Sequence, residues 1–289
     1  MKKENGPFEQ WLYGEVPIDG VCLYRAGLGL IIVVESILRL PYAVEFFSNQ
    51  GFHVGPLAAF APSPFAAVAL SLALIFFAIL VTVGYLTRPV LIMTLVLWSY
   101  LFLIDLINEK AAHSITIVML FFLFFSQCDA RYSVDDWLRR RRKLPRKKGT
   151  ASFFVQRLMQ VYILQGYFFS GLVKVINPDW ISGVTLQRIL MGRWATSLGV
   201  WLSGILPFPG FQLGSLLVIL FESIASPLLL VPGVRAAVIV AGICFHLAIS
   251  AALHVGSLSG HYILALLVLF PDPHDVRRAA QRVVKVHDD

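Results

Sequence analysis

The chain has 289 residues, of which 57% are hydrophobic and 14% are charged, with a formal net charge of +7. Soluble domains are typically about 45–50% apolar and about 25% charged, and a globule of this length has too little interior to bury so much apolar surface. The composition excludes a disordered chain, a coiled coil and a nucleic-acid-binding protein, and it argues against an ordinary soluble enzyme. It favours a helical protein that crosses a membrane several times.

Apolar segments long enough, or nearly so, to cross a bilayer follow one another along the chain. We expect no cleavable signal peptide before them, because the first residues lack an apolar core. The last segment is short and is expected to lean on its neighbours. The sequence therefore predicts an all-α, polytopic transmembrane helical bundle with about eight spans, at 19–40, 65–86, 88–107, 111–128, 153–175, 210–231, 233–254 and 257–271.

The orientation of these spans follows from the distribution of Lys and Arg. Residues 131–148 hold nine basic and two acidic side chains, and basic loops stay in the cytoplasm. Alternation then places both termini in the cytoplasm. We expect a cytoplasmic N-terminal segment (1–18), a transmembrane bundle (19–271) with a cytoplasmic basic loop (129–152) and an outer segment (176–209), and a cytoplasmic tail (272–289).

The outer segment contains a second, weaker pattern. Leu186, Ile189 and Leu190 lie at helical spacing, and Trp194 continues this apolar stripe. The pattern predicts an amphipathic helix in the outer membrane interface. Pro207 is expected to end any helix before the sixth span.

Ionisable side chains inside a span mark either a functional site or a paired group, because an isolated charge in lipid is costly. Glu35 and Arg39 lie four residues apart in the first span and can pair on one helix face. Arg25 lies in the same span. A structural ion pair and a functional role both fit this pattern.

The fifth span carries a polar stripe. Gln160, Tyr167 and Lys174 recur every seven residues, which places them on one helix face. Gly171 lies near that face and allows another helix or a ligand to approach closely. Lys174 either extends to the outer headgroups or is buried enough to be a neutral base.

The sixth and seventh spans each carry one polar group near mid-membrane, Glu222 and His246. Consecutive antiparallel helices usually touch, so these two side chains could meet, in which case Glu222 accepts a hydrogen bond from His246 and orients its ring. A histidine that is only a satisfied core residue fits the pattern equally well. The expected topology gathers further polar residues at the outer end of the bundle. These are His113, Lys174, Trp180, His254 and His261.

Metal binding and disulfides are not expected. The histidines occur singly on different helices, which is a weak pattern for a transition-metal site. The cysteines, Cys22, Cys128 and Cys244, are far apart and lack metal-ligand spacing.

Four short sequence patterns occur in order along the expected bundle. They are Tyr24 to Gly29 with Phe46 to Gly51, His113-Ser114 with Asp129 to Asp135, Tyr167 to Lys174 with Asp179-Trp180 and Gly183, and Glu222 with Phe245-His246. Together they resemble HTTM-domain proteins, the bacterial relatives of the vitamin K-dependent γ-carboxylase. The resemblance extends over most of residues 19–271.

This resemblance implies an activity and its residues. Lys174 matches the proposed base, which deprotonates a vitamin K-type hydroquinone such as menaquinol; oxygen and carbon dioxide then serve in the carboxylation of a peptide glutamate. His113 and His246 match histidines of the family and are expected to assist. We expect Tyr167, Trp180, Glu222 and Arg25 to bind the substrate or cofactor, without a metal.

One departure from the carboxylase concerns its large soluble domain, for which we expect no counterpart after residue 271. The resemblance therefore supports a gamma-glutamyl carboxylase-like lyase or quinol-dependent oxidoreductase less directly than it supports the membrane core. The expected partners are the lipid bilayer, a quinone-like lipid, and a secreted peptide or a separate soluble subunit. The alternative is a non-catalytic factor for maturation or immunity of a secreted peptide. We expect a bacterial plasma membrane, with the site toward the outer face.

Overall fold

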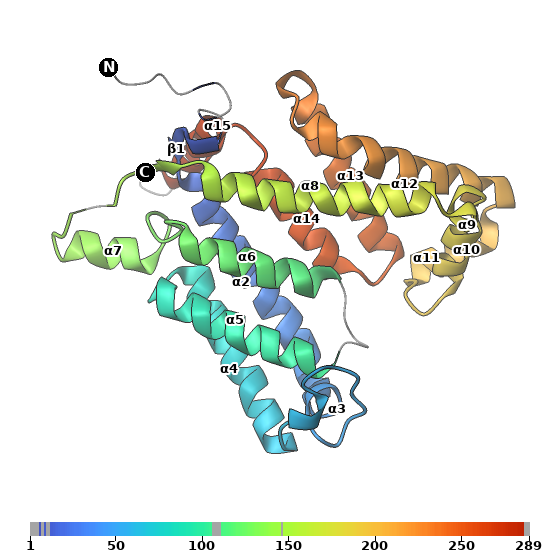
Figure 1. Cartoon of the computed structure of the whole chain (residues 1–289), viewed down its shortest axis with the longest axis horizontal. Helices are drawn as coiled ribbons and strands as arrows, with labels where there is room; N and C mark the ends of the chain where they lie inside the picture. Colours follow the sequence, from blue (N-terminus) through green and yellow to red (C-terminus); the bar gives the residue numbers. More distant parts are fainter. Residues whose placement is uncertain (1–5, 7–8, 10–11, 106–110, 146, 286–289) are drawn as a thin grey trace. The chain divides into compact units, whose positions relative to one another are not determined.

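The computed structural model describes residues 6, 9, 12–105, 111–145 and 147–285. Parts of both expected cytoplasmic ends therefore lie outside the described residues. Helices dominate the described chain (Figure 1). It forms two compact units: unit 1 comprises residues 1–158 and 272–289, and unit 2 comprises residues 159–271.

Unit 1 is built around four long helices that run up and down in sequence. Neighbouring helices pack against each other: α2 on α4, α4 on α5, and α5 on α6. The elements in chain order are β1 (Glu15–Pro17), α2 (Asp19–Arg39), η1 (Leu40–Tyr42), α3 (Ala43–Phe47), η2 (Ala58–Phe60), α4 (Pro64–Val83), α5 (Thr87–Ile104), α6 (Ala111–Phe125), α7 (Val134–Arg141), β2 (Thr150–Ser152) and α15 (Pro273–Lys285).

Local sequence accounts for the ends of these helices. Ser63 caps the start of α4, where its hydroxyl accepts a hydrogen bond from the Ala66 N–H, and Pro64 fits the first helical position. Gly84 ends α4 at φ +69°, a left-handed conformation that favours glycine. A sharp connection to α5 follows.

A short sheet and α15 lie at the same end of unit 1. β1 pairs with β2 antiparallel, with Glu15 opposite Ser152, and α15 packs against both β1 and α2. The segments before the first long helix and after the last one therefore meet. The number of membrane crossings and the side of the membrane on which these segments lie stay predictions.

Unit 2 contains the remaining helices. α12 packs on α13, α13 packs on α14, and the short α10 packs on α11 and α12. The elements are α8 (Phe154–Val175, which begins in unit 1), α9 (Pro178–Ile181), α10 (Val184–Met191), α11 (Ser197–Ile205), α12 (Phe208–Leu229), α13 (Pro232–Ala252) and α14 (Gly256–Val268).

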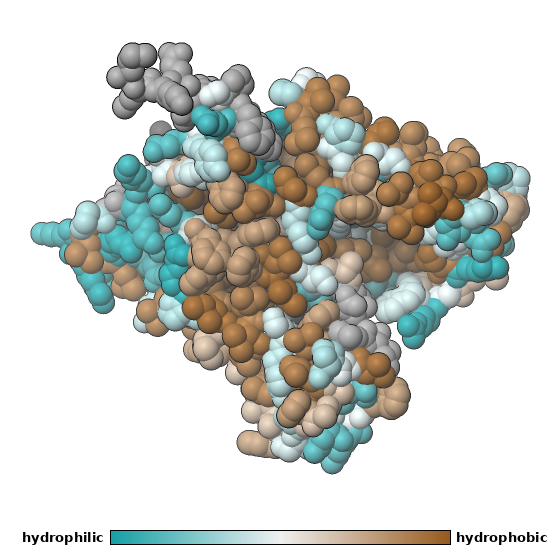
Figure 2. Space-filling view, in the orientation of Figure 1, coloured by the Kyte–Doolittle hydropathy of each residue, from teal (hydrophilic) through white to brown (hydrophobic). Residues whose placement is uncertain are grey.

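The all-α prediction is confirmed, and each of the eight expected spans contains a helix. Among the described residues, five segments are long and apolar enough to cross a membrane: Asp19–Phe47, Pro64–Val83, Thr87–Ile104, Phe208–Leu229 and Pro232–Ala252. Ala111–Phe125 and Gly256–Val268 are shorter apolar helices. Figure 2 shows hydrophobic surface over α5 and α6 and hydrophilic surface over α7. The chain is thus a helical membrane protein, and its total of eight spans stays a prediction.

The expected outer helix is present but shorter than its apolar stripe. α10 ends at Met191, so Trp194 lies beyond it rather than on its face. Leu190 is buried, and the Leu186 side chain lies against Gly214 of α12. Extension of the stripe to Trp194 was therefore wrong, because Gly192 leaves the helical conformation.

Candidate functional site

Lys174 and Glu222 form an ion pair in unit 2. Lys174 Nζ on α8 lies 2.5 Å from Glu222 Oε2 on α12 and 2.5 Å from Ser170 Oγ, one helical turn earlier. The Lys174 and Glu222 side chains are 14% and 11% exposed. A charged pair so little exposed is stabilised only by close geometry and further hydrogen bonds, and the Ser170 hydroxyl provides one.

Gly171 explains how the two helices come close enough for this pair. A Cβ atom at position 171 would lie 2.8 Å from both the backbone nitrogen and the hydroxyl oxygen of Ser223, a distance too short for any side chain. The absence of a side chain therefore lets α12 pack directly against α8. The close approach expected at Gly171 is confirmed.

Trp180 covers Lys174 from the adjoining short helix. Lys174 Nζ lies 5.0 Å from the centre of the Trp180 ring, within the range of a cation–π interaction. The Asn177 side chain caps α9 by accepting a hydrogen bond from the Asp179 N–H, and the Ser215 hydroxyl donates to the Trp180 carbonyl. These contacts fix the position of Trp180 beside Lys174.

A second polar pair joins α8 to α13. Tyr167 Oη lies 2.7 Å from His246 Nε2, and both side chains are buried. The Tyr262 ring stacks on the His246 ring at 4.7 Å, with 14° between the planes. The expected Glu222–His246 hydrogen bond was therefore wrong: Glu222 bonds to Lys174, and His246 bonds to Tyr167.

In unit 1, Glu35 connects two basic groups. Arg39 Nη2 lies 2.9 Å from Glu35 Oε1, which confirms the expected pair on α2. His113 Nε2 of α6 lies 3.0 Å from the same oxygen. The His113 ring is buried and makes T-shaped contacts with the rings of Trp98 and Phe102, whose centroids lie 5.4 and 5.7 Å away.

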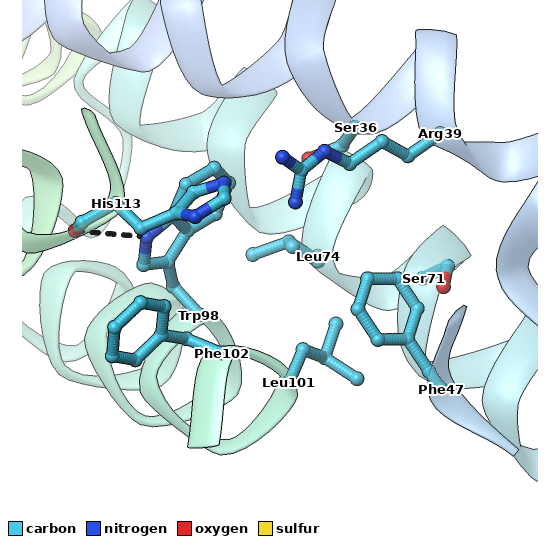
Figure 3. A pocket seen from close by; sticks show the side chains of 9 residues that line it. All are labelled: Ser36, Arg39, Phe47, Ser71, Leu74, Trp98, Leu101, Phe102 and His113. Carbon is cyan, nitrogen blue, oxygen red and sulfur yellow. Dashed lines mark hydrogen bonds between the residues drawn. The ribbon is translucent and has the colours of Figure 1, made fainter. Parts of the chain in front are cut away.

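His113 and Arg39 also face a pocket in unit 1 (Figure 3). The pocket holds about 380 Å³ of free space, including its open mouth. The Ser36 hydroxyl lines it, is buried, and has no hydrogen-bond partner among the described residues. The other residues that line it are Phe47, Ser71, Leu74, Trp98, Leu101 and Phe102.

The Arg25 side chain holds parts of the backbone of unit 1 together. It is fully buried and donates hydrogen bonds to four backbone carbonyls, two at the end of α4 and two in the connection after α6. Nε and Nη2 lie 3.1 Å from Cys128 O and 2.6 Å from Tyr132 O, and Nη1 bonds to Val81 O and Thr82 O. These carbonyls end helices or follow them, so Arg25 joins α2 to the ends of α4 and α6.

The remaining histidines of unit 2 are His254, between α13 and α14, and His261, in the second turn of α14. His261 is buried, and its Nδ1–H donates to Ser257 O at 2.7 Å. The backbone N–H of His254 donates to Trp194 O. Among the described residues, no group of three or more His, Cys, Asp or Glu side chains is arranged to hold a metal ion.

Sequence reasoning found Lys174, Trp180 and Tyr167 but missed their partners. Ser170 was detectable, because it precedes Lys174 by one helical turn. The bonds of Glu222 and His246 had no local signal, since their partners lie 48 and 79 residues away.

The sequence profile of the HTTM domain family matches residues 13–274, which cover both units. Comparisons with curated proteins and with solved structures gave no match.

Proposed function

The chain belongs to the HTTM-domain family, and on that premise we propose that it is the membrane core of a quinol-dependent enzyme whose Lys174 accepts a proton from a hydroquinone. The observation that carries this proposal is the little-exposed Lys174–Glu222 pair beside Trp180. A membrane protein retains such a pair at a cost, and intramembrane ionisable groups are functional by default.

The donor set around Lys174 suits a hydroquinone. A hydroquinone combines a flat aromatic ring with hydroxyl groups; Trp180 offers an aromatic face, and Lys174 and Ser170 offer groups that exchange protons. When bound, a vitamin K-type hydroquinone such as menaquinol supplies a removable hydroxyl proton and the reducing power that oxygen consumes. Lys174, Ser170 and Trp180 are the residues that would hold it.

Lys174 accepts the proton at Nζ, and this requires a free lone pair on that nitrogen. In the ion pair Nζ holds its full set of protons, so a lone pair would require the transfer of one of them to Glu222 Oε2, 2.5 Å away. The Trp180 face then stabilises the ammonium that forms. Glu222 is thus a proton partner of Lys174, and water exclusion by the surrounding apolar helices strengthens each of these interactions.

His246 assists through its hydrogen bond to Tyr167. Tyr167 lies two helical turns before Lys174 on α8. The Tyr167–His246 hydrogen bond therefore holds the part of α8 that precedes Lys174 in place against α13. We also propose an assisting role for His113, because it matches a histidine of the family and is buried at the pocket of unit 1. Arg25 is given no ligand-binding role, because its hydrogen bonds go to backbone carbonyls.

A bound hydroquinone would be oxidised by oxygen and would thereby supply the base that removes the γ-proton of a peptide glutamate, and carbon dioxide would take the place of that proton; the partner is a secreted peptide or a separate soluble subunit. The family resemblance supports this step, and the positive-inside rule supports a site toward the outer face of a bacterial plasma membrane. A non-catalytic factor for maturation or immunity is the competing function.

The test is oxygen consumption by menaquinol in nanodiscs that hold the purified protein. We expect Lys174→Ala to lower the rate by about 100-fold or more, the usual contribution of a general base. Lys174→Arg is expected to fail as well, because arginine stays protonated. The control is Arg188→Ala, which removes an exposed charge of unit 2. Unchanged menaquinol binding and oxygen consumption in folded Lys174→Ala protein would contradict the proposal and favour the non-catalytic factor.

A further inference from the structure

A cleft lies between the start of α5 and helix α7 in unit 1. It holds about 560 Å³ of free space, including its open mouth. Two arginines and a tyrosine combine in it with leucine side chains. The lining residues are Tyr85, Leu86, Asp135, Leu138, Arg139, Arg142 and Leu144.

The Asp135 carboxylate, which lines this cleft, accepts hydrogen bonds from the backbone at the start of α5. Asp135 Oδ1 accepts the Leu86 N–H at 2.9 Å, and Oδ2 accepts the Thr87 N–H and hydroxyl, each at 2.8 Å. Asp135 thereby caps the start of α5, where a negative charge is stabilised by the helix dipole. Its charge lies at the start of α5, and among the described residues no carboxylate forms an ion pair with Arg139 or Arg142.

The four consecutive arginines of this segment divide into two pairs. Arg140 forms an ion pair with the buried Asp136, and Arg141 lies over the Trp137 ring at 5.3 Å. Arg139 and Arg142 instead line the cleft. Arg139 Nη1 is buried and has no hydrogen-bond partner among the described residues. A buried guanidinium nitrogen without a hydrogen-bond partner lowers the stability of the fold. A ligand oxygen that accepts a hydrogen bond from Arg139 Nη1 would remove this cost.

The rim of the cleft is apolar and exposed. Leu86 and Leu144, which line the cleft, are each more than half exposed, as is Trp137 elsewhere on α7. Leu86 directly precedes α5, whose residues Thr87–Ile104 are apolar enough to cross a membrane. The rim therefore lies at the expected boundary between the hydrocarbon layer and the cytoplasmic headgroups, where aromatic and basic side chains anchor helices.

We propose that this cleft binds the phosphate headgroup of an anionic phospholipid from the cytoplasmic leaflet. Arg139 and Arg142 contact the phosphate, since guanidinium groups match its oxygens in geometry and charge. Leu86 and Leu144 contact the start of the acyl chains. The apolar rim selects a lipid over free phosphate, because free phosphate gains nothing from apolar contacts. This site is independent of Lys174 and of the proposed enzyme activity.

The test compares two charge-matched variants in binding to dioctanoyl phosphatidylglycerol, with the full-length protein in neutral detergent. Arg139→Gln/Arg142→Gln removes the cleft pair, and Arg141→Gln/Lys143→Gln removes two charges of the same segment that do not line the cleft. We expect the first variant to lose about tenfold or more in affinity, since each basic residue near a lipid phosphate contributes substantially. The second is expected to lose less than about threefold.

An equal loss in both variants would overturn the proposal, because it would reveal general attraction to a basic surface. Competition by inorganic phosphate as strong as that by phosphatidylglycerol would overturn the choice of a lipid. If the double variant fails to fold, the single variant Arg142→Gln is measured together with the wild-type preference for phosphatidylglycerol over phosphatidylcholine. Equal wild-type affinity for the two lipids would also overturn the proposal.

Discussion

Lys174 Nζ lies 2.5 Å from Glu222 Oε2, and this ion pair links α8 to α12, as does the hydrogen bond from the Ser226 hydroxyl to Leu164 O. The two residues are 48 positions apart in the sequence, and a glycine on α8 allows the helices to approach closely enough for the bond. The pair connects helix packing to the proposed chemistry, because any change that separates α8 from α12 also separates the lysine from its proton partner.

Removal of one partner from this pair should destabilise unit 2. We expect Glu222→Gln to lower the free energy of unfolding by about 1–3 kcal/mol; a fully buried pair would lose about 3–5 kcal/mol, and partial exposure reduces the effect. Lys174→Met/Glu222→Gln should lose less than the sum of the two single changes. A double-mutant cycle from denaturant unfolding in mixed micelles measures this coupling. Strict additivity would show that the pair contributes nothing to stability.

The close approach at Gly171 gives a packing prediction. Gly171→Ala adds a Cβ atom that meets the backbone of α12 at Ser223, so we expect a loss of about 1–3 kcal/mol in stability. The control is Gly204→Ala in α11, where a Cβ atom would meet nothing within 4 Å. Thermal unfolding of both variants in the same detergent makes the comparison. Equal midpoints would mean that α12 adjusts without cost.

Because the hydrogen bonds of Arg25 go to backbone carbonyls, we expect its substitution to lower the stability of the protein and to leave its affinity for a ligand unchanged. Lysine has three donors from a single nitrogen and cannot reach four carbonyls in the directions that the guanidinium serves. We expect Arg25→Lys to cost about 2 kcal/mol or more, since each bond to a charged donor contributes about 1.5–3 kcal/mol. Menaquinol affinity of the folded fraction should stay unchanged. A selective loss of that affinity at wild-type stability would restore a ligand-binding role.

Tyr132, in the connection between α6 and α7, predicts an alkaline limit to stability. Burial and the hydrogen bond that its hydroxyl donates to Asp19 Oδ1 at 2.7 Å raise the pKa of Tyr132 above its usual value. The folded protein therefore holds this proton more tightly than the unfolded chain does. The resulting stabilisation is complete below about pH 10, the ordinary pKa of tyrosine, and is lost as pH rises toward the higher folded value.

The measurement is the unfolding midpoint of wild type and Tyr132→Phe from about pH 8 to about pH 11. We expect the wild type to be the more stable protein at the lower end and this advantage to shrink between about pH 10 and about pH 11. Tyr42→Phe, at an exposed position on unit 1, serves as the control. A constant difference between wild type and Tyr132→Phe across the range would contradict the assignment.

The amino-acid sequence by itself determined the class of protein and the positions of its long helices. Apolar composition and segment length are local properties, so all eight expected segments contain helices, and so does the amphipathic part of the outer segment. The Glu35–Arg39 pair was equally accessible, because a spacing of four places two side chains on one helix face.

Only the tertiary structure decided how the polar side chains are paired. Glu222 and His246 each had more than one possible partner at similar depth, and the choice depends on the relative rotation and approach of α8, α12 and α13. Small residues such as Gly171 set that approach, and their effect depends on the helix that packs against them. The same reason explains Arg25: the sequence shows a charge in an apolar span, whereas folding brings four backbone carbonyls to it.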